Sequence, residues 1–173
     1  VAEDNPGNTY HVPLNPGARK QFGNARMQGF TCCNGTALES STKLQNSIYL
    51  GSADHRTLYV NLFIPSEVNW LSKQVRLRQE TRFHEQGPTT LTVMTPRPVY
   101  IDELERDPYW AKLGATVKLN GIPNKDHGTS SAGLSVSRAW QDNDRLEFTF
   151  PMSLLAATMA DDKSLVAFMV GPL

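Results

Sequence analysis

The chain has 173 residues, of which 39% are hydrophobic, and its 17 Lys and Arg balance its 17 Asp and Glu. This length can bury a sizeable core, and a net charge of zero excludes the broad positive field of a nucleic-acid-binding protein. No apolar run approaches the roughly 20 residues of a membrane span, and the polar N-terminus shows no signal-peptide core. We therefore expect neither a nucleic acid nor a membrane as partner, and the compartment stays open.

The first 31 residues are predicted to be irregular, because seven Pro and Gly residues interrupt them. A helix is predicted over residues 36–50, where Thr36 and Glu39 match the capping box that begins many helices. One face of this helix would pack closely against neighbours, since it carries small and apolar side chains at helical spacing: Ala37, Ser41, Leu44 and Ile48.

From Thr57 onward the hydrophobic period changes from helical to two. The segment "VRLRQETRF" (75–83) alternates apolar and charged residues, which is typical of a strand with one buried face. Turn-like breaks such as "QDND" and "ADDK" separate further segments of the same kind. The pattern predicts a mainly β protein, an antiparallel jelly-roll-like β-sandwich preceded by an irregular segment and one α-helix. Its strands are expected at 57–64, 75–83, 89–95, 115–121, 133–140, 145–150 and 165–170.

The two cysteines of the chain, Cys32 and Cys33, are adjacent and stand just ahead of the predicted cap at Thr36. A helix N-terminus favours the thiolate, which is the reactive and metal-binding form of cysteine. Two thiolates alone do not complete a zinc site, which takes four ligands or three and an open position. The alternative is that two small apolar residues pack under a helix end. The histidines show no ligand spacing: His11, His55, His84 and His127.

Several segments together resemble glycoside hydrolase family 127, the β-L-arabinofuranosidase-like family. They are "FTCCNGTALESSTKLQNSIYL", "TLYVNLFIPSEVNW", "VRLRQETRF", "DPYWAKLGATVKLNG", "RAWQDNDRLEFTFPMSL" and the terminal "LVAFMVGPL", in the same order as in the family. The resemblance covers nearly the whole chain from about Phe30. It implies that residues 1–50 correspond to the end of a catalytic (α/α)6 barrel and residues 51–173 to the β-sandwich domain that follows it.

The resemblance also implies a retaining glycosidase that acts on arabinofuranosides or similar plant-polysaccharide sugars, with zinc as cofactor. Cys32 would then be nucleophile and zinc ligand, and Cys33 a second ligand. In the family the acid/base Glu and a Glu-x-Cys element with the other two ligands lie upstream, whereas the first 31 residues here hold one Glu, Glu3, and no Cys. We therefore expect this chain alone to be inactive and to bind zinc weakly or not at all.

The segment "VYIDELERDPYW" departs from the family, which usually has an alternating strand there. Its acidic residues make a strand doubtful: Asp102, Glu103, Glu105 and Asp107.

Two other interpretations of the chain compete with the enzyme fragment, and three tryptophans distinguish between them. Trp70, Trp110 and Trp140 are either platforms for sugar rings, as in a carbohydrate-binding module, or core and interdomain packing, as in a purely structural sandwich. Their solvent exposure distinguishes the two.

The charged side chains are expected to be structural. Asp142 with Asp144 and Asp161 with Asp162 suit turns, and His84 and His127 are expected to be exposed. A solvated or interdomain face is predicted for Arg76, Arg78 and Arg82. Apolar residues of 36–64 would be exposed without a barrel, which predicts self-association through this surface.

Overall fold

The computed structural model describes residues 17–19, 32–85, 87–106, 108–130 and 133–172. The chain divides into two compact units, Val1–Asn46 and Ser47–Leu173, and each is described here by itself. None of the helices among these residues is long and apolar enough to cross a membrane.

The helix of the first unit, α1, spans Cys32–Lys43 and continues as a 3-10 turn, η1 (Leu44–Ser47). It begins four residues before the predicted cap, so Thr36 lies inside the helix and the capping-box prediction is wrong. Its hydroxyl side chains bond back to the helix, as when Ser40 Oγ donates to the Thr36 carbonyl at 2.8 Å. All side chains from Thr36 to Ser47 are exposed, so this face does not pack closely against any part of the chain that the structure describes, and Ile48 just beyond it is buried.

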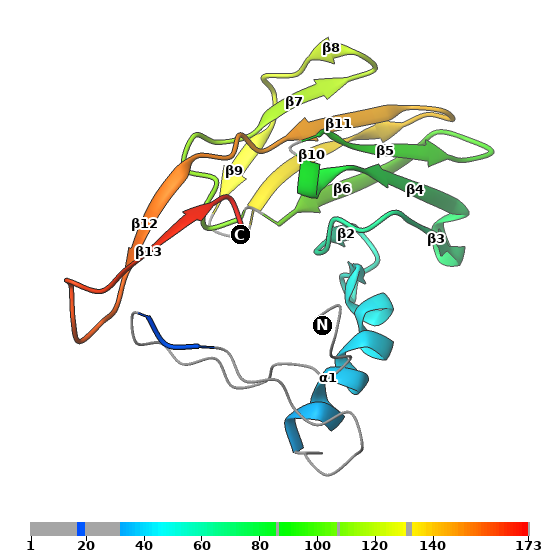
Figure 1. Ribbon diagram of the computed structural model, residues 1–173. Helices are drawn as coiled ribbons and strands as arrows, with labels where there is room; N and C mark the ends of the chain where they lie inside the picture. The colour runs from blue at the N-terminus through cyan, green and yellow to red at the C-terminus, as the bar shows by residue number, and fades with distance from the viewer. Residues whose placement is uncertain (1–16, 20–31, 86, 107, 131–132, 173) are drawn as a thin grey trace. The chain divides into compact units, whose positions relative to one another are not determined.

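The second unit contains two sheets and a separate hairpin (Figure 1). The first sheet has the order β1 (Tyr49–Gly51), β2 (Thr57–Val60), β6 (Val99–Glu105), β10 (Gly133–Trp140) and β9 (Gly128–Ser130). The second has the order β3 (Ser66–Trp70), β4 (Val75–Thr81), β5 (Thr89–Met94), β11 (Arg145–Thr149), β7 (Thr116–Leu119) and β8 (Ile122–Pro123). The hairpin pairs β12 (Leu154–Thr158) with β13 (Val166–Val170), and short 3-10 turns lie at η2 (Leu71–Lys73) and η3 (Phe83–Glu85).

The two sheets share one hydrophobic core, which confirms the predicted sandwich. Leu58 and Ile101 of the first sheet belong to the same buried cluster as Leu77 and Leu91 of the second. The pairs are antiparallel except β2 with β6, which run parallel. An aromatic group continues the core beyond the strands, with the Phe63 ring centroid 5.0 Å from that of Phe83 and 5.3 Å from that of Phe148.

Strand β4 follows the predicted alternation. Val75, Leu77 and Gln79 are buried, whereas Arg76 and Glu80 between and after them are exposed. Two-residue periodicity predicts such a strand well, because successive side chains point to opposite faces of a sheet.

The doubt about the acidic segment is wrong: residues 99–105 form β6, in the middle of the first sheet. It pairs with β2 on one side and with β10 on the other. Pairing on both edges satisfies its backbone groups, and this tertiary context outweighs the low strand propensity of its carboxylates. Glu103 is 4% exposed within it.

Other differences concern short or polar strands. β2 ends at Val60 rather than at residue 64, and its Leu58 and Val60 are buried, so this part of 36–64 exposes no apolar face. Five strands are too short, too polar or too irregular in their alternation to be predicted from the sequence: β1, β3, β8, β9 and β12.

Candidate functional site

The predicted nucleophile and its neighbour are the first two residues of helix α1. Cys32 and Cys33 therefore do not precede the helix, as the sequence analysis had them, but belong to its first turn. The first four N–H groups of a helix have no partner within it, and the helix dipole adds partial positive charge there. Both features favour a thiolate. The side chains of both cysteines lie outside the described part of the chain, so the thiolate stays a prediction.

The described side chains, which do not include those of Cys32 and Cys33, form no metal site of their own. Among them no group of three or more His, Cys, Asp and Glu side chains could hold a metal ion. A tetrahedral zinc site has four ligands, or three and an open position, so the two thiols alone do not complete one. His55 is exposed in a turn with φ 55°, while the His127 ring is half-buried, with Nδ1 2.9 Å from the Asn124 carbonyl. The prediction of an exposed His127 is thus wrong, and the side chain of His84 lies outside the described residues.

The tryptophans divide between core and surface. Trp110 and Trp140 are only 3% and 2% exposed, and the Trp140 Nε1–H donates to the Ile101 carbonyl at 3.2 Å. Neither can stack on a sugar, so the core interpretation holds for both. Trp70 is partly buried at the end of β3, where one side of it packs against the hydrophobic core, and the Lys73 ammonium lies 6.0 Å from its ring centroid.

A depression of about 600 Å³ adjoins Trp70. Asn69 and Gln74 contribute exposed amides to its wall, and Arg76 contributes a guanidinium. The sequence analysis singled out Trp70 and Arg76 but not the two amides. The only signal for them was their position beside a tryptophan in a polar edge segment. The remaining lining residues are Leu71, Val75, Met94, Thr95 and Pro96.

The paired carboxylates hold turns, as predicted. Asp144 is 7% exposed and accepts hydrogen bonds from the Asn120 amide at 2.8 Å and from the Gln141 N–H at 2.9 Å. Asp142 accepts from the Thr95 N–H at 2.9 Å. In the β12–β13 turn, the Ser164 hydroxyl and N–H donate to Asp162 and lower the pKa of that carboxyl below its usual value.

The strand arginines form a solvated face with simple ion pairs, also as predicted. The Arg78 guanidinium lies 2.6 Å from Glu67 on the neighbouring strand β3, and this hydrogen bond raises the pKa of Arg78. Arg82 lies 3.7 Å from Glu85. All these side chains are at least 39% exposed, so the pairs stabilise the fold little.

A buried polar group joins β4 to the chain around β3. Gln79 is 1% exposed, and its amide donates to the Leu62 and Ile64 carbonyls at 3.1 and 2.9 Å. The Tyr49 hydroxyl lies 3.0 Å from the Ser66 hydroxyl nearby. Burial raises the pKa of Tyr49 above its usual 10.0, against the opposing effect of its hydrogen bonds. This group fixes the segment that leads into β3 and has a structural role.

Comparison with solved structures places this sandwich among the domains of glycoside hydrolases. A GH127 β-L-arabinofuranosidase from Geobacillus stearothermophilus T6 superposes with a TM-score of 0.70, at 25% identity over 82% of this chain and 23% of its own. A structure described as a glycoside hydrolase gives 0.71, at 21% identity over 94% of this chain and 28% of its own. The GH127 β-arabinofuranosidase BT3674 gives 0.69, at 21% identity over 83% of this chain and 26% of its own.

The family model of the GH127 β-L-arabinofuranosidase middle domain matches residues 57–152, more than half of the chain. The chain therefore belongs to this family. No curated protein matches. The chain spans about a quarter of the length of the solved relatives, and Cys32 and Cys33 precede the residues that the family model matches.

Proposed function

We propose that this chain is the middle part of a retaining glycosidase for arabinofuranosides or similar sugars, and that it contributes the nucleophile Cys32. The observation that carries the proposal is the start of α1 at Cys32, which gives this residue a helix N-terminus. Membership of the GH127 family supports the reaction class, and the resemblance of the "TCCNGT" segment to that family supports the choice of residue.

The proposed first step is attack by the Cys32 thiolate on the anomeric carbon. A C–S bond forms while the C–O bond to the leaving group breaks, and the leaving oxygen takes a proton from a general acid. In the second step water forms a C–O bond at the same carbon while the C–S bond breaks and the thiolate leaves, and the general acid of the first step, now a base, takes the proton of the water; two inversions thus retain the configuration. The helix N-terminus stabilises the sulfur as an anion before attack and again when it leaves.

The general acid and the orientation of the sugar are expected from outside these 173 residues. A general acid typically contributes about 10²–10⁴-fold to the rate, and a site that orients the reactants contributes more. We therefore propose that the chain alone does not turn over arabinofuranosides.

Cys32 and Cys33 would supply two of the four ligands of a zinc ion, which would lower the pKa of their thiols when bound. In the family the other two ligands belong to an upstream Glu-x-Cys element, and the first 31 residues here hold no Cys, so the chain alone is expected to hold zinc weakly or not at all.

The experiment is the pH dependence of alkylation of the 173-residue chain by iodoacetamide, with peptide mapping to assign each thiol. Cys32→Ala and Cys33→Ala each leave one cysteine and serve as matched controls for each other. We expect the Cys32 thiol to react with a midpoint below the ordinary value of about 8.5. A midpoint at or above that value in the Cys33→Ala variant would contradict activation of Cys32 by the helix.

A further inference from the structure

The depression beside Trp70 lies where three strands of the second sheet meet at one end. β3 ends at Trp70, β4 begins at Val75 and β5 ends at Met94, and Arg76 on β4 faces Met94 across the ladder. The depression has a volume of about 600 Å³, large enough for one or two sugar rings. It is thus a surface hollow with an aromatic wall.

Several hydrogen-bonding groups around this hollow have no partner in the described part of the chain. They are the Trp70 indole N–H and the side-chain amides of Asn69 and Gln74, three residues that line the hollow. The Arg76 guanidinium, by contrast, donates a weak hydrogen bond to the Met94 sulfur at 3.3 Å. Amides both donate and accept, as sugar hydroxyls do. Trp70 offers an apolar ring with a polar edge, which suits a ligand with an apolar face and hydroxyls at its rim.

The wall is held in place by backbone geometry. Gln74 has a φ of 58°, a left-handed conformation that is unfavourable for a residue with a Cβ, and its N–H donates to the Leu71 carbonyl at 3.1 Å. On the opposite side, the Thr95 hydroxyl donates to the Arg97 carbonyl at 2.8 Å. The two sides of the hollow are therefore ordered before any ligand binds.

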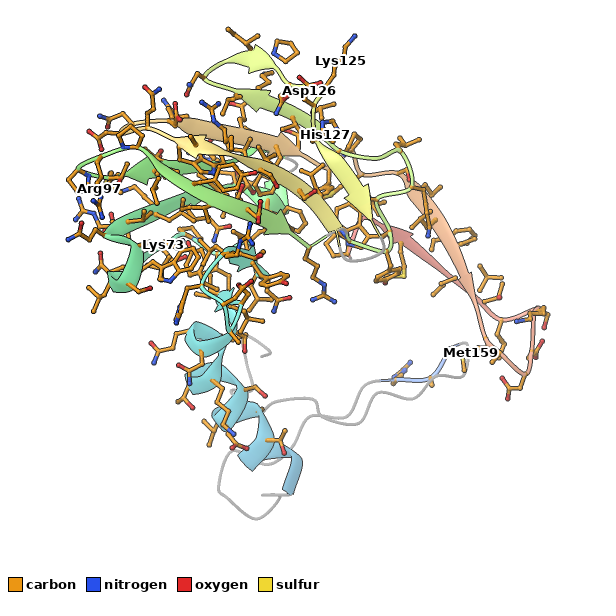
Figure 2. The ribbon with its side chains drawn as sticks, turned by 180° about the vertical axis from the view of Figure 1, so that it is seen from behind. Lys73, Arg97, Lys125, Asp126, His127 and Met159 are labelled. Atoms are coloured by element: carbon orange, nitrogen blue, oxygen red, sulfur yellow. The ribbon has the colours of Figure 1, made fainter. Side chains whose placement is uncertain are left out.

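Positive charge exceeds negative charge at this end of the sheet. Lys73 precedes β4 and Arg97 follows β5, and because these strands are antiparallel both residues lie at the same end, as Figure 2 shows. Arg76 adds a third cation. The nearest acid in an ion pair is Glu67, which lies 2.6 Å from Arg78 and only 4.0 Å from Arg76. Glu67 is shared between Arg76 and Arg78, and Asp142 accepts a hydrogen bond from the Thr95 N–H beside the hollow. Three cations, Lys73, Arg76 and Arg97, therefore face these two carboxylates, and the balance at this end of the sheet is positive.

We propose that this hollow binds an acidic saccharide, a sugar ring that carries a carboxylate. The ring would lie against the Trp70 indole, its hydroxyls would exchange hydrogen bonds with Asn69 and Gln74, and its carboxylate would pair with Arg76. A planar guanidinium suits a carboxylate because it can donate two parallel hydrogen bonds. This inference goes beyond the proposed function and does not depend on Cys32.

The test is calorimetric titration of the 173-residue chain with trigalacturonate. Its methyl ester keeps the rings and removes the charge, and sodium acetate supplies the charge without a ring. We expect trigalacturonate to bind at least about 10-fold more tightly than the ester or acetate, which is the size of one charge-assisted hydrogen bond. The affinity should also fall as salt rises above about 0.1 M. Absence of binding, or equal binding of the ester or of acetate, would overturn the proposal.

Variants locate the ligand on the surface. Arg76→Gln should weaken binding about 10-fold. Arg106→Gln is the control and should leave binding unchanged. It also removes an exposed arginine, but Arg106 follows the end of β6, whereas Arg97 precedes its start, so Arg106 lies away from the hollow. Asn69→Ala and Gln74→Ala should each weaken binding and, being exposed, should not disturb the fold. Equal effects of the two arginine variants, or no effect of either amide variant, would sink the assignment to this hollow.

Discussion

The role of Trp140 in the core that the two sheets share can be tested by truncation. Its side chain is 2% exposed and donates from Nε1 to the Ile101 carbonyl on β6 at 3.2 Å. Trp140→Ala removes the buried ring and leaves a cavity, which typically costs about 3–5 kcal/mol of unfolding free energy. The lost hydrogen bond adds about 1 kcal/mol, so we expect a total loss near the top of that range.

Trp70→Ala is the matched control, because it removes the same side chain from a partly buried position. A tryptophan that buries about two thirds of its roughly 200 Å² loses about 3 kcal/mol at 25 cal/mol per Å². Urea unfolding followed by far-ultraviolet circular dichroism measures both, since that signal does not depend on the substituted tryptophan. A Trp140→Ala loss smaller than that of Trp70→Ala would refute the placement of Trp140 in the shared core.

Three further outcomes follow from the same structure. Because burial raises the pKa of Tyr49 above 10.0, the stability that its protonated form provides is present below about pH 10 and is lost as pH rises above it. The urea midpoint should therefore fall more between pH 8 and pH 11 for the natural chain than for Tyr49→Phe. An equal fall in both proteins would contradict the raised pKa of Tyr49. Arg78→Ala should cost no more than about 1 kcal/mol in urea unfolding, since its pair with Glu67 is exposed, and a loss above about 2 kcal/mol would contradict this. Self-association of the chain through the 36–64 surface should appear in sedimentation velocity and weaken in Leu38→Ser, whose leucine is 67% exposed, whereas a single monomer at high concentration would disprove it.

Period-two patterning predicted the strands whose two faces differ. β4 and β10 match their predicted bounds within two residues, because buried and exposed side chains alternate along both. The edge strand β3 escaped notice because its sequence "SEVNW" is polar, and an edge strand needs few apolar residues. β6 was doubted because its carboxylates argue against a strand, whereas partners on both sides, far apart in the sequence, decide its structure.

The start of the helix shows how a local motif can mislead. Thr36 and Glu39 fit a capping box, yet α1 begins at Cys32, and Glu39 instead pairs with Lys43 one turn later. The motif is compatible with a helix interior as well as with its start, so spacing alone could not choose between them.

The candidate binding hollow could be predicted only in part. Trp70 was recognised as either a sugar platform or core, and the sequence could not separate these, because burial depends on which strands meet beside it. Asn69 and Gln74 come together through the antiparallel pairing of β3 with β4, and Pro96 joins them through the pairing of β4 with β5. For the cysteines, adjacency in the sequence was sufficient to single out the pair, and the rest of a catalytic centre was expected elsewhere.

The most direct test of the central claim is activity of a chimaera, in which residues 30–173 replace the corresponding part of the Geobacillus stearothermophilus enzyme. With the barrel supplied, we expect hydrolysis of an aryl β-L-arabinofuranoside and its loss by about 10³-fold or more on Cys32→Ala, with the fold of both proteins verified by circular dichroism. The isolated 173-residue chain should show no appreciable turnover. Undiminished hydrolysis by the Cys32→Ala chimaera, or robust hydrolysis by the isolated chain that is lost on Cys32→Ala, would contradict the proposal that this chain contributes a nucleophile to a site completed from outside it.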